Sequence, residues 1–140
     1  MVAPMQANER REQLSAALLA ALLRELRETW VNLNYQLFHN AMQPPQLMLV
    51  ELEGILGRFD ARERVLSLSL PFVLAQPWSA LVEVLKHEMA HQFVFEVLRV
   101  TDETAHGPAF QHVCEKRGID PRAQGVPEAR TEAGPEDKVL

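Results

Sequence analysis

Residues 79–100 form a segment of helical length that is apolar on most sides, and this segment constrains the fold more than any other. Its apolar side chains recur at helical intervals: Leu81, Val82, Leu85, Met89, Phe93 and Val97. Ser79 at its start is a residue type that favours a helix N-cap. A helix with so little polar perimeter must pack between other elements. We therefore expect a central helix, on which every polar residue needs an explanation.

The middle of this helix carries His87-Glu88-Met89-Ala90-His91, which fits the pattern H-E-x-x-H. Four helical residues advance by about 400°, so both imidazoles emerge from nearly the same face, with Cβ atoms roughly 5–6 Å apart. Both rings can then bind one metal ion, while Glu88 flanks them as a general base for the attacking water. Two core histidines with satisfied hydrogen bonds are the alternative, but burying these polar groups without a metal is costly. The motif therefore predicts a zinc site.

A catalytic zinc site needs three protein ligands and an open fourth position. The downstream candidates for the third ligand are His106, His112, Glu96, Asp102, Glu103 and Glu115. Glu96 points away from the histidine face, and Asp102 and Glu103 follow the helix end too closely to fold back. His106 can return to the site, because the chain has turned by then and Gly107-Pro108 fixes a tight entry into another helix.

The remaining elements complete an α+β fold. From about Glu9 to Asn40, leucines at helical intervals predict an N-terminal helix with a buried stripe, bent or broken near Asn32. Three apolar runs predict strands at 47–52, 55–60 and 65–70, and the short links between them favour antiparallel hairpins. We thus expect an N-terminal helical region, a small three-stranded, largely antiparallel sheet, the central zinc-binding helix and a short C-terminal helix.

The expected domain boundaries lie where the apolar periodicity stops. Residues 1–8 show no period, so we expect a flexible N-terminus before a single domain at 9–119. Residues 120–140 combine three prolines, two glycines and mixed charge, which predicts a disordered acidic tail.

Composition argues against several classes of protein. The chain has 14 Lys and Arg against 19 Asp and Glu, a net charge of -5, and so lacks the basic excess of a nucleic-acid binder. The single cysteine, Cys114, provides neither a disulfide nor a cysteine zinc ribbon, and we expect a buried thiol in a cytoplasmic protein. The apolar run at 14–23 is too short to span a membrane and lacks the flanks of a signal peptide.

Several other polar residues have ordinary interpretations. We expect His112 to lie at the surface or to have a structural role, and His39 to lie at a helix end. Arg58, Arg62 and Arg64 are interleaved with acidic residues, which favours a solvated hairpin over a phosphate contact.

Two motifs together resemble the SprT-like metallopeptidases. His106-Gly107-Pro108-Ala109-Phe110 fits the second motif of that family, H-G-x-x-F, and begins fifteen residues after His91. Ala109 departs from the family pattern, in which many relatives carry Glu. The similarity extends from about Trp30, through Gly57-Arg58-Phe59-Asp60 and Leu66-Ser67-Leu68-Ser69, to about Gly118.

The resemblance implies a zincin-like fold and a zinc-dependent endopeptidase. His87, His91 and His106 would hold one catalytic Zn²⁺, and Glu88 would be the general base. The alternative is a catalytically silent zinc-binding interaction module, against which the presence of Glu88 argues.

The resemblance also implies a protein or peptide substrate. The family's use of a strand before the zinc helix makes the strand at 65–70 the expected docking edge for an extended peptide. We expect no counterpart of the cysteine-bearing module and nucleic-acid-binding extensions of larger relatives, and therefore duplex binding no tighter than about 10⁻⁴ M. The leucine pattern of the first helix lasts too few heptads for a dimer seam, so we expect a monomer that does not bind membranes.

Overall fold

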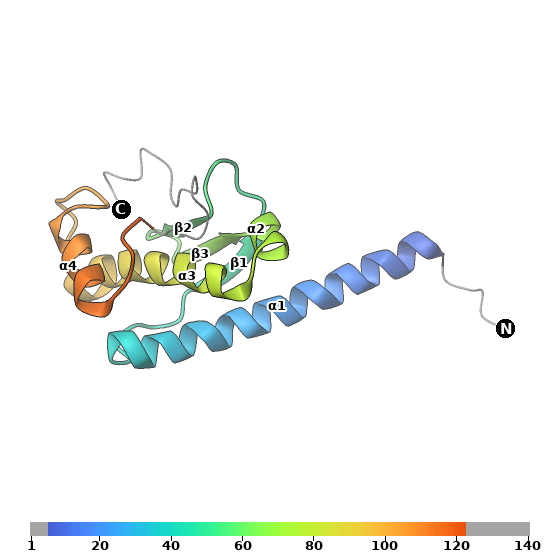
Figure 1. Ribbon diagram of the computed structural model, residues 1–140, viewed down its shortest axis with the longest axis horizontal. Helices are drawn as coiled ribbons and strands as arrows, with labels where there is room; N and C mark the ends of the chain where they lie inside the picture. Colours follow the sequence, from blue (N-terminus) through green and yellow to red (C-terminus); the bar gives the residue numbers. More distant parts are fainter. Residues whose placement is uncertain (1–5, 123–140) are drawn as a thin grey trace.

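The computed structural model describes residues 6–122, which form four α-helices, one π-helical turn and three strands (Figure 1). In chain order the elements are α1 (Ala7–Phe38), β1 (Gln46–Val50), β2 (Gly57–Asp60), β3 (Val65–Ser69), α2 (Leu70–Ala75), α3 (Trp78–Phe93), η1 (Val94–Leu98) and α4 (Pro108–Arg117). This confirms the expected α+β class. Residues 1–5 and 123–140, which carry most of the predicted flexible N-terminus and acidic tail, lie outside the described residues.

β2 and β3 form the antiparallel hairpin that the sequence predicts. The turn between them is closed by Asp60, whose Oδ1 accepts hydrogen bonds from the backbone N–H of Arg62 (3.0 Å) and of Glu63 (3.1 Å). Asp60 is a residue type that stabilises such turns through its own side chain.

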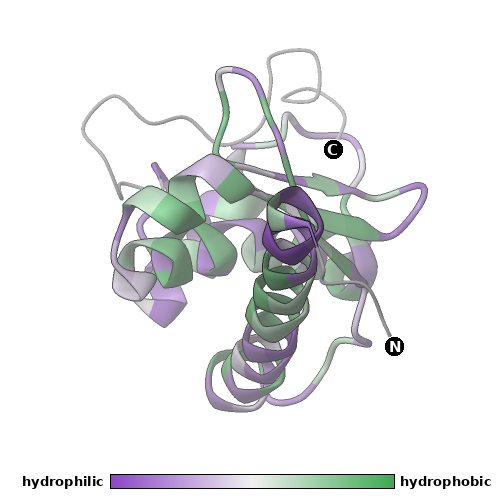
Figure 2. Cartoon of the chain, turned by 90° about the vertical axis from the view of Figure 1, so that its right-hand side faces the viewer, coloured by the Kyte–Doolittle hydropathy of each residue, from purple (hydrophilic) through white to green (hydrophobic). Residues whose placement is uncertain are grey.

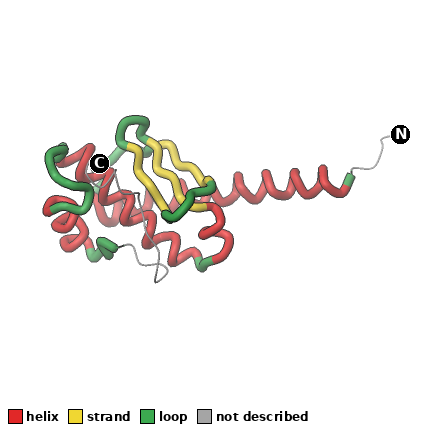
Figure 3. The backbone as a smooth tube through the Cα atoms, turned by 90° about the horizontal axis from the view of Figure 1, so that it is seen from above, coloured by secondary structure: helices red, strands yellow, loops and turns green. Residues whose placement is uncertain are grey.

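β1 pairs with β3 in parallel, so the sheet is mixed, with the strand order β1-β3-β2. Figure 3 shows the three strands side by side. The expected hairpin between the first two strands is therefore wrong. The link at 51–56 is long enough to carry the chain past β3, and in it Leu56 O accepts a hydrogen bond from Ser69 N at 2.9 Å. β3 is consequently the central strand, and both of its edges are occupied.

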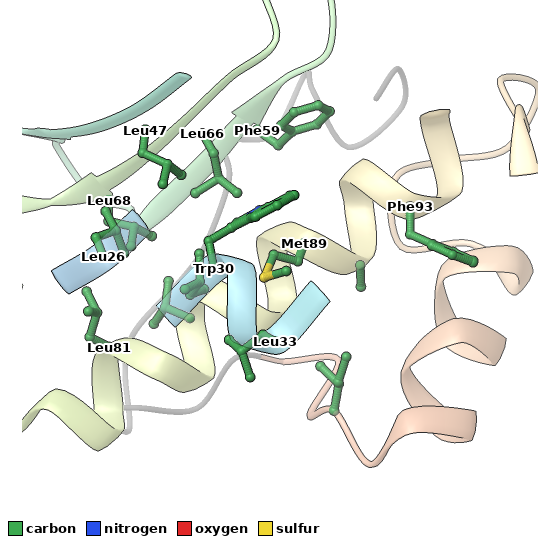
Figure 4. Close-up of a cluster of buried hydrophobic side chains, with 14 of the residues drawn as sticks. Leu26, Trp30, Leu33, Leu47, Phe59, Leu66, Leu68, Leu81, Met89 and Phe93 are labelled. Atoms are coloured by element: carbon green, nitrogen blue, oxygen red, sulfur yellow. The ribbon is translucent and has the colours of Figure 1, made fainter. Parts of the chain in front are cut away.

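α1 and α3 cover one face of the sheet and enclose the core with it (Figures 3 and 4). The strands alternate, so that every second residue faces the helices. The labelled core residues of Figure 4 come from α1, the three strands and α3: Leu26, Trp30, Leu33, Leu47, Phe59, Leu66, Leu68, Leu81, Met89 and Phe93. The expectation that the helix following the sheet is central is confirmed, because residues 87–94 are all buried.

α1 is one continuous helix and does not break near Asn32. The buried amide of Asn34 donates from Nδ2 to Met42 O (2.9 Å) and accepts at Oδ1 from Met42 N (3.2 Å), so the segment that follows the helix satisfies it. The N-terminal half of α1 projects beyond the sheet (Figure 1), and in this half Leu14 and Leu18 are 71% and 51% exposed. The predicted buried stripe is therefore wrong for this half of the helix.

Hydrophobic and hydrophilic residues lie side by side along α1 (Figure 2).

No helix within residues 6–122 is both long enough and apolar enough to cross a membrane.

α3, which carries the H-E-x-x-H motif, begins and ends at other residues than predicted. Pro77, and not Ser79, occupies the N-cap of α3, while Ser69 caps the unpredicted helix α2 by accepting a hydrogen bond from Phe72 N at 3.2 Å. After Phe93 the helix widens into the π-helical turn η1, which ends at Arg99 in the left-handed conformation (φ 57°). Such π-helical turns are rare and frequently lie at functional sites.

Candidate metal centre

The first two histidines of the site lie one helical turn apart in the middle of α3. Both side chains are buried, and the Nε2 atoms of His87 and His91 are 3.2 Å apart. This is the geometry that the i, i+4 spacing predicts, because those two positions share one face of a helix.

The third histidine comes from the loop between η1 and α4. His106 is half-buried, and its Nε2 lies 3.3 Å from Nε2 of His87. Gly107 follows as the N-cap of α4, and a Cβ atom there would lie 3.0 Å from Thr104 O. Glu103, considered above as a ligand, instead accepts a hydrogen bond from Ala109 N at 2.8 Å and so satisfies the first turn of α4.

The three histidines fit one metal ion. One ligand atom from each lies within 4.8 Å of the others, and among the described residues they form the group suited to binding a metal. A tetrahedral zinc ion with Zn–N bonds of about 2.0–2.1 Å requires ligand nitrogens about 3.3 Å apart. The observed separations of 3.2 Å and 3.3 Å agree with that requirement.

Phe110, in the first turn of α4, packs against all three imidazoles. Its ring stacks on His91, with centroids 4.2 Å apart and planes at 16°, and meets His87 and His106 edge-on at 4.9 Å and 5.0 Å. Phe110 is itself buried. It therefore forms an apolar support that restricts the orientation of each ring.

Burial keeps two of the rings uncharged. The pKa of His87 is lowered to about 3, first by burial and then by the neighbouring His106, while a hydrogen bond to the backbone of Asp120 opposes the shift. The pKa of His91 also lies well below its ordinary value, because of burial and then of the two other histidines. Neutral imidazole is the form that binds a metal.

Glu88 is fully buried in α3, next in sequence to His87. It does not belong to the three-histidine group, in keeping with a role other than ligand. Its Cγ atom faces Gly57 at the start of β2, across the contact between α3 and the sheet.

The structure separates the other polar residues from this centre. His112 is exposed on α4, and Asp102 and Glu115 are exposed as well. His39 is exposed beyond the end of α1, in the left-handed conformation. Cys114 is buried as expected, and its burial raises the pKa of the thiol to about 12.

One sequence-based expectation about the hairpin holds in part, and another is wrong. Arg58 and Arg62 are exposed as expected, whereas Arg64, with 40% of its side chain exposed, also binds Glu96 of η1, with Nε 2.6 Å from Oε2. β3 is central in the sheet, so it has no free edge on which a peptide could dock.

Sequence reasoning missed three contributors to the centre. Phe110 was visible only as the last letter of H-G-x-x-F, and Gly57 only as part of a family-like strand. Asp120 was assigned to the tail, although its backbone contacts His87. Their roles depend on contacts between segments far apart in the chain, which no local pattern encodes.

Comparison with known proteins gives two results. A family model described as the SprT-like family matches residues 23–132. A stretch of 44 residues is 48% identical to the DNA-dependent metalloprotease dvc-1 of Caenorhabditis elegans. That stretch is 31% of this chain and 12% of the relative, so the similarity spans a small part of that protein.

Proposed function

Because the chain belongs to the SprT-like family, we propose that it is a zinc-dependent endopeptidase. His87, His91 and His106 are the proposed ligands, and Glu88 is the proposed general base. The observation that carries the proposal is the convergence of three imidazole nitrogens at spacings that suit one tetrahedral ion, on the helix that also carries a buried glutamate.

Zinc is the metal best supported by the donor set. Imidazole nitrogen suits zinc, copper, iron and nickel, but three protein ligands with an open fourth position are typical of catalytic zinc. The low pKa values of His87 and His91 favour metal binding in general, since both rings are uncharged and ready to bind at neutral pH.

The bound ion would supply Lewis-acid catalysis, polarising the scissile carbonyl and activating water. Glu88 takes one proton from the attacking water at a carboxylate oxygen while the new C–O bond forms. It then gives that proton to the amide nitrogen while the C–N bond breaks, so that the products are a carboxylic acid and an amine. Phe110 holds the three imidazoles in place during both steps.

We propose the outer edge of β2 as the docking edge for substrate, in place of β3. β2 lies at one end of the strand order and pairs only with β3 within the described sheet. Its first residue, Gly57, contacts the helix turn that carries Glu88. An extended peptide can add to such an edge through main-chain hydrogen bonds.

Cleavage by this chain is proposed not to depend on DNA, although the Caenorhabditis elegans relative is named DNA-dependent. The chain carries a net charge of -5, and the carboxylate of Glu96 neutralises Arg64. Arg58 and Arg62 are exposed on the hairpin, and two arginines are too few for strong binding to phosphates.

The proposal is tested with protein purified without added metal. We expect about one zinc per chain by elemental analysis and cleavage of casein, with Glu88→Gln keeping zinc and losing at least 10²-fold in kcat. Bound zinc without cleavage in the wild type would favour the silent module. A tenfold stimulation by single- or double-stranded DNA would contradict DNA independence.

A further inference from the structure

Gly57 occupies a position in the sheet that has no room for a side chain. A Cβ atom there would lie 2.9 Å from Cγ1 of Val84, 3.0 Å from Cδ2 of Leu68 and 3.1 Å from Cγ of Glu88. Carbon atoms in contact normally lie about 3.5–4.0 Å apart. Any side chain at this position must therefore displace at least one of these three neighbours.

The backbone does not require glycine at this position. The described glycines with positive φ are Gly54 and Gly118, and Gly57 is not among them. Gly57 is instead paired with Leu68 in the antiparallel ladder, where glycine weakens a strand. The requirement comes from the close approach of α3 to β2, and Glu88 is one of the residues that makes this approach.

The three neighbours differ in how easily they can move. Val84 and Leu68 are fully buried in the core, and Val84 is also β-branched and therefore stiff at χ1. Glu88 is equally buried, but its side chain is unbranched and has several rotatable bonds. A methyl group at position 57 would press on all three neighbours, and its contact with Cγ of Glu88 would shift the carboxyl group that Cγ carries.

We propose that Gly57 is a positioning residue for Glu88: its missing side chain leaves the space in which the Glu88 chain packs, and so fixes where the carboxylate lies relative to the three histidines. This inference rests on the proposed function, in which Glu88 moves the proton. The three heavy atoms nearest to a Cβ atom at position 57 belong to Val84, Leu68 and Glu88, and not to a histidine. We therefore expect an effect on proton transfer without a loss of metal binding.

The test compares wild type, Gly57→Ala and Gly118→Ala in zinc content, zinc affinity and peptidase kinetics. Gly118 has φ +67° and no neighbour within 4 Å of a Cβ atom, so its substitution strains the backbone without crowding a side chain and controls for a loss of stability far from Glu88. We expect Gly57→Ala to keep zinc and KM within about threefold and to lose at least tenfold in kcat, with a shifted acid limb of the pH profile. Gly118→Ala should keep the wild-type kcat.

A readout without turnover accompanies the kinetics. The NMR signal of the Glu88 carboxyl carbon, assigned with Glu88→Gln, should move in Gly57→Ala and stay in place in Gly118→Ala. A folded, zinc-bound Gly57→Ala variant with the wild-type signal and kcat overturns the inference, whereas a zinc-bound but inactive wild type overturns the proposed function instead.

A second variant serves where Gly57→Ala does not fold. Adding Val84→Ala removes the tightest contact, at 2.9 Å, and leaves the one with Glu88. We expect this double variant to bind zinc and to stay at least tenfold slow relative to Val84→Ala alone. Recovery of the kcat of Val84→Ala would show that only the spacing of helix and strand matters, and would overturn the inference.

Discussion

The guanidinium of Arg64 binds the carboxylate of Glu96 through two hydrogen bonds, Nε to Oε2 at 2.6 Å and Nη2 to Oε1 at 2.9 Å. This bond raises the pKa of Arg64. The amide of the buried Gln92 also donates to Oε1 of Glu96 (3.0 Å) and to Gln43 O (3.0 Å). These bonds join the β2–β3 turn to the link before β1 and to the C-terminal end of α3. Gln92, which takes part in them, directly follows His91 in the sequence.

Replacing Glu96 by alanine should lower the free energy of unfolding by about 1–3 kcal/mol. The ion pair alone contributes little, because Arg64 is 40% exposed and solvent screens its charge. Most of the cost comes from removing an acceptor of the buried Gln92. Glu83→Ala is the matched control, since Glu83 pairs with Lys86 on the surface of α3, and it should change stability by less than about 0.5 kcal/mol. Urea unfolding of both variants measures the difference, and equal midpoints would contradict the prediction.

Replacing Phe110 by alanine should weaken metal binding by about 10- to 100-fold, the range typical of residues that support metal ligands. The reason is that the ring contacts all three imidazoles. Val113 on the same helix is equally buried but has no aromatic ring, so Val113→Ala should lower stability and keep the zinc affinity. Competition with a zinc chelator measures the zinc affinity of both variants. An equal loss of affinity in the two variants would mean that Phe110 acts only through core packing.

The metal-free protein should lose stability as the pH falls below about 6.5. An unfolded histidine titrates near 6.5, whereas the pKa of His87 in the fold is about 3 and that of His91 is also strongly lowered. Between these values the unfolded chain binds more protons, so the free energy of unfolding decreases by up to about 1.4 kcal/mol per pH unit for each histidine. Above about 6.5 this contribution is fully present. Urea unfolding between pH 5 and 8 measures the slope of the free energy of unfolding against pH. His112 is exposed, so the His112→Ala variant should show the same slope. A flat profile would contradict the lowered pKa values.

Removing His106 should abolish stoichiometric zinc binding, whereas removing His112 should not. His106 places its Nε2 3.3 Å from that of His87, while His112 is exposed on α4. With two protein ligands left, water must complete the coordination, and the affinity falls. Zinc content after gel filtration compares His106→Ala with His112→Ala. Retained zinc in the first and lost zinc in the second would reverse the ligand assignment.

The histidine pair could be predicted from sequence because its geometry is local. Residues i and i+4 of a helix share a face in any fold, so His87 and His91 needed only a confident helix. His106 is fifteen residues further on, and only the resemblance to a known family selected it over His112.

The features that sequence reasoning did not predict depend on long-range packing. Gly57 and Glu88 meet only because β2 lies against α3, and Arg64 meets Glu96 across 32 residues of chain. The parallel pairing of β1 depends likewise on where the link at 51–56 passes. An apolar stripe indicates that a helix face can be buried, but it does not indicate whether the rest of the domain is long enough to bury it. α1 is longer than the sheet that it covers (Figure 1).

Replacing Leu14 or Leu18 by serine should leave the free energy of unfolding within about 0.5 kcal/mol of wild type, because these side chains are 71% and 51% exposed on the projecting half of α1. Leu26 is the matched control in the same helix: it is fully buried, so Leu26→Ala should cost about 2–5 kcal/mol. We expect a monomer, in which nothing covers the projecting half of α1. Light scattering of the wild type should therefore give the mass of one chain. A dimer mass that Leu18→Ser reduces to one chain, with a stability loss near that of Leu26→Ala, would instead mean that a second copy buries this face in solution.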